Sequence, residues 1–149
     1  MPVLLGPSLG TLTDGQVHTL RLLAGKVVAE HPSAGVVEVI LADDALLRRL
    51  NGAYGGRARA TDVLSFDLRP TPAPAPDGQV CGEVYISVER ARAQADEQGV
   101  ALVEEVGRLL THGLLHLAGY EHNTPGALQE MEGETDRLLQ GAGLLATPR

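Results

Sequence analysis

The sequence predicts an α+β fold, close to the α/β class, with a small mixed four-stranded sheet packed by about five helices in a single domain. Segments with apolar residues at helical spacing alternate with short β-branched segments, in the order helix, strand, helix, two strands and three helices. The length of 149 residues, with 44% hydrophobic and 21% charged residues, is that of one globular domain with a sizeable core.

The N-terminal part begins with a helix predicted over residues 14–30, where apolar residues recur at helical spacing. Thr13 is its expected N-cap, and His31-Pro32 ends it because a residue before proline disfavours helical geometry. The β-branched run at residues 36–42 predicts a buried strand. A short helix should follow, with Asp43 as its N-cap.

Two further strands are predicted at residues 62–68 and 80–87, and they are expected to pair antiparallel. A proline-rich loop at residues 69–78 joins them, because four prolines in ten residues disfavour both a helix and a sheet ladder. Alternate residues of the first strand share one face. Since Phe66 is the only phenylalanine of the chain, we expect it to be buried in the core.

The C-terminal part is predicted to form three helices. The first begins after Ser87, and the third begins at Thr124-Pro125, a cap followed by a first-turn proline. The second, over residues 100–118, is apolar on nearly all sides and should therefore be buried. Its Glu105 and Arg108 are interpreted as charges on the helix surface.

Composition limits the class of protein. No apolar run is long enough to span a membrane, and the first residues lack the basic and apolar regions of a signal peptide. Cys81 is the only cysteine, so an internal disulfide is excluded and a cytoplasmic location is expected. The net charge of −7 argues against non-specific nucleic-acid binding, although residues 48–61 contain four arginines and no acid.

Residues 112–122 carry three of the five histidines. His112 and His116 lie one turn apart on one face of the predicted helix. Gly119 can end that helix in a left-handed conformation, and the turn can bring His122 back toward the first two. Two such histidines alone are more often surface or core residues. Three imidazoles with an open fourth position are typical of a catalytic zinc site, so one Zn²⁺ ion is expected here.

The same spacing occurs in the long zinc motif of the metzincin peptidases, glycine included. Those enzymes place a glutamate directly after the first histidine, as the general base for the zinc-bound water. Here that position is Gly113, which has no side chain to accept a proton. The residues therefore favour metal-activated water, and a metalloprotease is the less favoured alternative.

The segment His-Gly-Leu-Leu-His-Leu-Ala-Gly-Tyr-Glu-His at residues 112–122 also resembles the signature of the YbeY family of bacterial metal-dependent endoribonucleases. Two other segments agree with this family in the same order. Thr-Asp-Val-Leu-Ser-Phe at residues 61–66 resembles one family strand, and Gly-Glu-Val-Tyr-Ile-Ser at residues 82–87 resembles another. The likeness covers about residues 36–139.

The resemblance implies a zinc-dependent, single-strand-specific endoribonuclease that acts in 3′-end maturation of 16S rRNA and in ribosome quality control. It also implies that His112, His116 and His122 hold one zinc ion. The partners it implies are single-stranded rRNA and the small ribosomal subunit, and neither DNA nor a membrane is expected. On this interpretation residues 1–149 form one metal-dependent hydrolase domain.

The sequence departs from the family where an arginine usually follows an aromatic residue. That position is Gly55, and Ala60 and Asp67 stand where prolines are usual. Arg57 or Arg59 is the candidate to supply the missing catalytic cation, which would stabilise charge on the reacting phosphate. The missing arginine keeps a second alternative open, namely a non-catalytic ribosome assembly factor that zinc stabilises.

Overall fold

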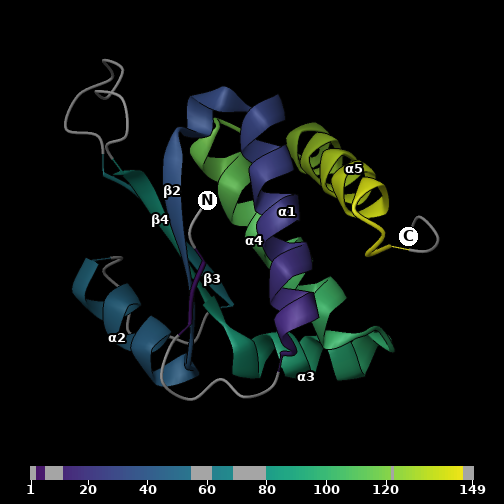
Figure 1. Cartoon of the computed structure of the whole chain (residues 1–149). Coiled ribbons are helices and arrows are strands. Elements are labelled where there is room, and N and C mark those ends of the chain that lie inside the picture. The colour runs from purple at the N-terminus through teal and green to yellow at the C-terminus, as the bar shows by residue number, and fades with distance from the viewer. Residues whose placement is uncertain (1–2, 6–11, 55–61, 69–79, 122, 146–149) are drawn as a thin grey trace.

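The computed structural model describes residues 3–5, 12–54, 62–68, 80–121 and 123–145. Helices α1, α4 and α5 lie on one side of a mixed sheet, and α2 lies on the other (Figure 1). The elements in chain order are β1 (Val3–Leu5), α1 (Asp14–Glu30), the 3₁₀ turn η1 (Pro32–Ala34), β2 (Val36–Ala42), α2 (Asp44–Tyr54), β3 (Val63–Asp67), β4 (Val80–Ser87), α3 (Val88–Gln98), α4 (Leu102–Leu117) and α5 (Pro125–Gly141). The α+β class and the five α-helices agree with the prediction.

The strand order in the sheet is β1-β2-β4-β3. Strands β1, β2 and β4 run parallel, whereas β3 pairs antiparallel with β4, so the predicted antiparallel pair is confirmed. The sequence pattern does not locate β1, because three residues are too few to show an alternation. The proline-rich loop predicted at residues 69–78 lies outside the described residues. None of the helices in the described ranges is long and apolar enough to cross a membrane.

The predicted helix caps are present. The Thr13 side chain accepts a hydrogen bond from the backbone N–H of Gln16 at 3.1 Å, and the Gln16 side chain accepts one from the N–H of Thr13 at 2.9 Å. Ser87 and Thr124 cap α3 and α5, because their hydroxyl oxygens accept hydrogen bonds from the backbone N–H groups of Arg90 and Ala127. These bonds satisfy N–H groups that a helix start leaves without a partner, and they fix where each helix begins.

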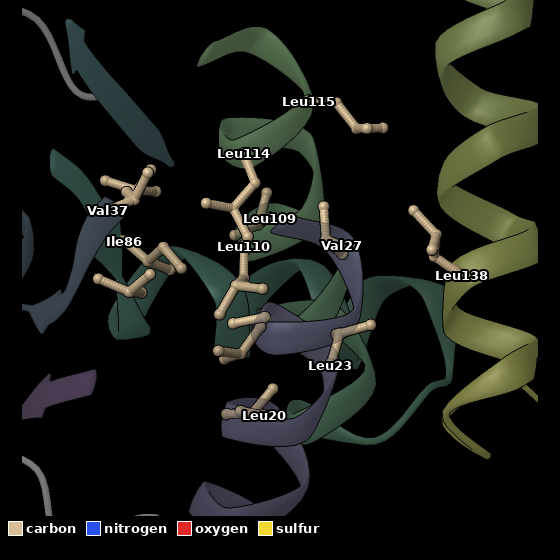
Figure 2. Packing of buried hydrophobic residues seen from close by; sticks show 14 of the residues in the cluster. Leu20, Leu23, Val27, Val37, Ile86, Leu109, Leu110, Leu114, Leu115 and Leu138 are labelled. Carbon is tan, nitrogen blue, oxygen red and sulfur yellow. The ribbon is translucent and has the colours of Figure 1, made fainter. Parts of the chain in front are cut away.

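Helix α4 is the centre of the hydrophobic core, as its apolar sequence indicates. It lies between the sheet on one side and α1 and α5 on the other (Figure 2). Figure 2 shows leucines of α4 between strand residues and residues of the two neighbouring helices; the labelled ones are Leu109, Leu110, Leu114, Leu115, Val37, Ile86, Leu20, Leu23, Val27 and Leu138. Burial of these side chains holds α4 in place, and α4 carries two histidines of the motif.

Two glycines allow α4 to approach the sheet closely. A Cβ atom on Gly113 would lie 2.6 Å from Cγ1 of Val84 and 3.0 Å from Oγ of Ser65. A Cβ atom on Gly82 would lie 2.9 Å from Cδ1 of Leu117. A side chain at position 113 would therefore push α4 away from the sheet, whereas one at position 82 would displace at least the end of the Leu117 side chain.

The expected burial of Phe66 is wrong. The side of β3 that faces α4 carries Ser65, and Val63 packs against the core. Phe66 lies on the other side of the strand, is only half-buried, and contacts the Tyr85 ring edge-on at a centroid distance of 5.8 Å. The close approach of α4 leaves room for a small residue such as Ser65 on the inner side, and the phenylalanine takes the side near α2.

The interpretation of two α4 charges as surface groups is also wrong. Glu105 is only 3% exposed. The Arg108 side chain is 18% exposed, and one of its terminal nitrogens lies 2.8 Å from Oδ1 of Asp136 on α5. This ion pair links α4 to α5 beside the histidine face, and its low exposure makes it less screened by water than a surface pair.

Candidate metal and active site

His112 and His116 stand one turn apart on α4, and both are half-buried. Their ring centroids are 5.5 Å apart, and the ring planes are nearly perpendicular at 88°. Two imidazoles bound to one tetrahedral zinc ion, with Zn–N bonds of about 2.0–2.1 Å, have centroids roughly 5 Å apart. The separation of the two rings is thus compatible with a metal ion shared between them.

The two histidines line a cleft of about 480 Å³ between α4 and β3. The opposite wall is polar, because Asp62, Ser65 and Asp67 line it together with apolar residues. Among the described residues that line the cleft there is no lysine or arginine. Two imidazoles and two carboxylates therefore line one cleft, and all four are groups that can accept or donate a proton.

Ser65 fixes the histidine pair relative to β3. Its hydroxyl donates a hydrogen bond to the backbone carbonyl of Gly113 at 3.2 Å, directly after the first histidine of the motif. Contact of Gly113 with Val84 prevents a closer approach of the helix to the sheet, and the hydrogen bond from Ser65 opposes movement away from it. A glutamate at position 113, which the peptidase motif requires, would not fit between α4 and the sheet.

Asp62 is held at the end of the cleft by two elements. Its Oδ2 accepts a hydrogen bond from the Gln94 amide of α3 at 3.1 Å, and its backbone carbonyl accepts one from the N–H of Ser87 at 2.9 Å. The sequence pattern alone does not mark Asp62 or Asp67 as site residues. Alternation along residues 62–68 places Asp67 on the face of Ser65, but only the packing of α4 on that face reveals its proximity to the histidines.

The chain leaves α4 through a tight turn. Gly119 has a φ of 108°, in the region that favours glycine, as its position in the motif predicts. The N–H of Gly119 donates to the carbonyl of His116 at 3.1 Å, and the N–H of Tyr120 donates to the carbonyl of Leu115 at 2.9 Å. These two bonds form a Schellman motif, which ends the helix just after Leu117 and reverses the chain.

Contacts with α1 and α5 hold Tyr120 after this turn. Its ring packs edge-on against His31 at a centroid distance of 5.4 Å, and His31 Nε2 lies 2.6 Å from Oε2 of Glu134. Arg137 donates to both carboxylate oxygens of Glu134 at 2.7 Å. The hydrogen bond from Arg137 holds the pKa of Glu134 below its usual value. Burial raises the pKa of Tyr120, and the negative charge of Glu134 acts in the same direction.

Three predicted site residues, His122, Arg57 and Arg59, lie outside the described residues. Within the described ranges, no three His, Cys, Asp or Glu side chains are grouped closely enough to hold a metal ion. The structure thus brings His112 and His116 together with Asp62 and Asp67. The three-histidine site as a whole stays a prediction.

Comparisons with known proteins identify the family of the chain. The family model described as Endoribonuclease YbeY matches residues 15–143. A protein from Moorella thermoacetica named Endoribonuclease YbeY is 40% identical over 136 residues, which cover 86% of this chain and 87% of that protein. One of the same name from Desulfitobacterium hafniense is 37% identical over 145 residues, covering 94% and 88% of the two chains.

A Myxococcus xanthus protein of the same name is 41% identical over 106 residues, and the match spans 36% of that longer protein. The solution structure of TM1509 from Thermotoga maritima superposes with a TM-score of 0.60 at 26% identity and covers 95% of this chain and 91% of its own. Family model, relatives and fold give one answer: the chain belongs to the YbeY endoribonuclease family.

Proposed function

We propose that the chain is a zinc-dependent endoribonuclease that cleaves single-stranded RNA, acting in 3′-end maturation of 16S rRNA and in ribosome quality control. Membership of a family whose curated relatives are named endoribonucleases supports this activity. The observation that carries it is the pair of imidazoles, 5.5 Å apart, that faces two carboxylates across one cleft.

In this proposal His112, His116 and His122 hold one zinc ion. When bound, zinc supplies a Lewis acid that polarises a phosphoryl oxygen and lowers the pKa of a coordinated water. The protein's own contribution is to fix the first two imidazoles, through the hydrogen bond from Ser65 to Gly113 and the close packing of Gly113 on the sheet. Such fixed ligands bind a metal without a further loss of conformational freedom.

The carboxylates of the cleft are proposed to transfer protons during the reaction. Hydrolysis of a phosphodiester forms a bond from a water oxygen to phosphorus and breaks the bond to the leaving ribose oxygen. Asp62, held by Gln94, and Asp67 are placed to accept the proton of the attacking water. The proton must then reach the leaving oxygen, which would otherwise depart with a full negative charge.

A cationic side chain is needed besides the metal. Phosphate is anionic, and the described lining of the cleft offers two carboxylates but no lysine or arginine. We propose that Arg57 or Arg59 supplies this charge, because both follow α2 and precede β3, whose first residues line the cleft. If Arg57→Ala, Arg59→Ala and the double variant all cleave RNA at the wild-type rate, this assignment is wrong.

The net charge of −7 supports a specific target over general RNA binding. Proposed partners are therefore single-stranded rRNA within the small ribosomal subunit, and the proposed location is the cytoplasm. A protein that neutralises few phosphates gains affinity from a defined assembly, where shape and protein contacts add to the RNA contacts.

The test is cleavage of a defined single-stranded RNA by the purified full chain, with the same sequence as a duplex and as DNA for comparison. We expect cleavage of the single-stranded RNA alone, loss of cleavage in His116→Ala, and normal cleavage in His18→Ala, whose histidine is exposed on α1. Equal activity of the two histidine variants would contradict the proposal. No RNA cleavage by wild type, together with unfolding on zinc removal, would instead favour the non-catalytic assembly factor.

A further inference from the structure

A second cavity adjoins the cleft and has no role in the chemistry described above. It has a volume of about 600 Å³ and lies among α3, α4 and α5. Asp62, Val63 and His112 line both cavities, so the two meet at the first histidine of the motif. A chain-like ligand whose reacting group lies at the histidines would extend from there into this second cavity.

The charges of the second cavity exclude a phosphate as its natural occupant. Four carboxylates line it, those of Asp62, Glu105, Glu132 and Asp136, against one guanidinium, that of Arg108. The ion pair of Arg108 with Asp136, at 2.8 Å, neutralises part of the only positive charge among these residues. An anion would therefore be repelled, whereas a neutral group rich in N–H donors would be attracted.

A bound metal ion is also a poor occupant. Although four carboxylates line the cavity, no three acidic or histidine side chains of the described residues are close enough to share one ion. Hard cations need several oxygen ligands that converge on one point.

The rest of the wall fits a flat heteroaromatic ring. Leu109 and Val63 provide apolar surface, and Leu128 of α5, 38% exposed, stands at the cavity. Gln94 and Gln98 of α3 place amide groups on the same wall. Apolar surface for the faces of a ring and polar groups for its edge are the two requirements for binding a nucleobase that is not stacked in a helix.

We propose that this cavity, lined by Gln94, Leu109, Leu128, Glu132 and Asp136, binds a nucleobase next to the cleaved phosphate and prefers bases that carry an exocyclic amino group. This inference rests on the proposed RNA-cleaving function. Ionised carboxylates only accept hydrogen bonds. Cytosine, adenine and guanine each present an amino group to them, whereas uracil presents two carbonyl oxygens and a single N–H.

The first test measures kcat and KM of the zinc-loaded full chain on four single-stranded RNA oligonucleotides. They are identical except for the bases that flank the cleaved bond, which are cytosine, adenine, guanine or uracil. We expect kcat/KM for the uracil substrate to be lower by roughly tenfold or more, mainly through KM. Equal kcat/KM values for the four substrates would overturn the proposal.

Replacement of carboxylates by amides should change the preference. The double variant Glu132→Gln/Asp136→Asn keeps the shape of the wall but adds N–H donors, so the disadvantage of uracil should shrink or reverse. Glu97→Gln, an exposed change on α3 outside the cavity, should keep the wild-type preference. If Asp136→Asn prevents folding, the base preference of the single variant Glu132→Gln is the test. Glu132 is exposed, so this variant should fold. An unchanged preference in a folded variant would count against the proposal.

Binding of free nucleosides separates this proposal from the nuclease function, because it requires neither cleavage nor zinc. In NMR titrations of the full chain, cytidine should shift the methyl resonances of Leu109 and Leu128 and the side-chain amide of Gln94. Uridine at the same concentration should leave them nearly unchanged. If cytidine shifts none of them, the base-binding site is refuted even when RNA is cleaved. If cytidine shifts them while RNA is not cleaved, the site stands and the nuclease function fails.

Discussion

The position where a Cβ atom of Gly113 would stand is 2.6 Å from Cγ1 of Val84. Val84 is fully buried in β4, and its β-branched side chain has restricted rotation about χ1. Packing therefore requires a glycine at position 113, directly after the first histidine, and this glycine has no side chain that could act as a base. One contact explains both the close approach of α4 to the sheet and the lack of the peptidase glutamate.

Gly113→Ala should destabilise the protein although alanine is the better helix former. Overpacking costs about 1–3 kcal/mol, and the 2.6 Å contact with the buried Val84 places this site toward the upper end, above the roughly 1 kcal/mol that alanine gains over glycine in a helix. Gly133→Ala in α5 is the matched control, because nothing lies within 4 Å of its added Cβ. Urea denaturation should show a lower free energy of unfolding for Gly113→Ala and an equal or higher one for Gly133→Ala.

A second variant identifies the clash itself. Val84→Ala alone leaves a cavity and should lower stability, but it also removes the two methyl carbons that the Cβ atom introduced by Gly113→Ala would meet. The double variant Gly113→Ala/Val84→Ala should therefore be more stable than the sum of the two single effects predicts. Simple additivity would mean that the contact is relieved by a shift of the helix instead.

Ser65→Ala should weaken metal binding without unfolding the protein. Loss of the hydrogen bond to the Gly113 carbonyl removes about 0.5–1.5 kcal/mol of stability and loosens α4 at the histidine pair. Zinc affinity, measured by competition with a chelating dye, should fall. Thr19→Ala removes a comparable hydroxyl bond to the carbonyl of Gly15, at 3.0 Å within α1, and should leave zinc affinity unchanged.

Acid should remove the stabilisation that Glu134 provides. The hydrogen bonds from Arg137 lower the pKa of Glu134 below its ordinary value of 4.5, so the native state favours the charged form. This contribution is complete above pH 4.5 and disappears as the pH falls through the lower native pKa. Glu134→Gln should thus unfold more easily than wild type at pH 7, by roughly 1–2 kcal/mol, and the difference should vanish in acid.

The control for this pH dependence lies on the same helix. Glu132 is exposed, so Glu132→Gln should change stability little at any pH. Thermal unfolding of the three proteins between neutral pH and roughly pH 3 checks the expectation. If Glu134→Gln is still less stable than wild type at the lowest pH, the shape of the side chain, and not its charge, holds α5 to α1.

Zinc removal should abolish activity but leave the fold largely intact. The core is built from apolar contacts of α4 with the sheet, α1 and α5, and it does not depend on a metal ligand in the described residues. Ligand binding by itself raises the melting temperature. Apart from that shift, the melting temperature of the chelated protein should stay within a few degrees of the zinc-bound value. Complete unfolding on chelation would indicate a structural zinc site.

Local chemistry made much of the fold predictable. Thr13, Ser87 and Thr124 cap their helices as their side chains indicate, and Gly119 adopts the left-handed conformation that ends α4. Each of these features depends on a few neighbouring residues, so a single sequence contains the necessary information. The apolar pattern of residues 100–118 likewise identifies the buried helix that carries the histidine pair.

Features that depend on distant segments were not predictable. Phe66 would be assigned to the core from its size, but the contact between Gly113 and Val84 leaves no room for it beside α4. Arg108 resembles a surface charge until α5 brings Asp136 within 2.8 Å of it. Asp62 is held opposite the histidines by hydrogen bonds from Gln94 of α3 and from the N–H of Ser87, both distant in the sequence.

The most direct measurement is a zinc titration of the metal-free full chain with the rate of single-stranded RNA cleavage as the readout. Activity should be absent without metal, rise in proportion to added zinc, and reach its plateau at one ion per chain. His116→Ala should stay inactive at every zinc concentration, while His18→Ala should follow the wild type. Full activity of the metal-free chain, or wild-type activity of His116→Ala, would contradict a metal-dependent ribonuclease site at the histidine pair.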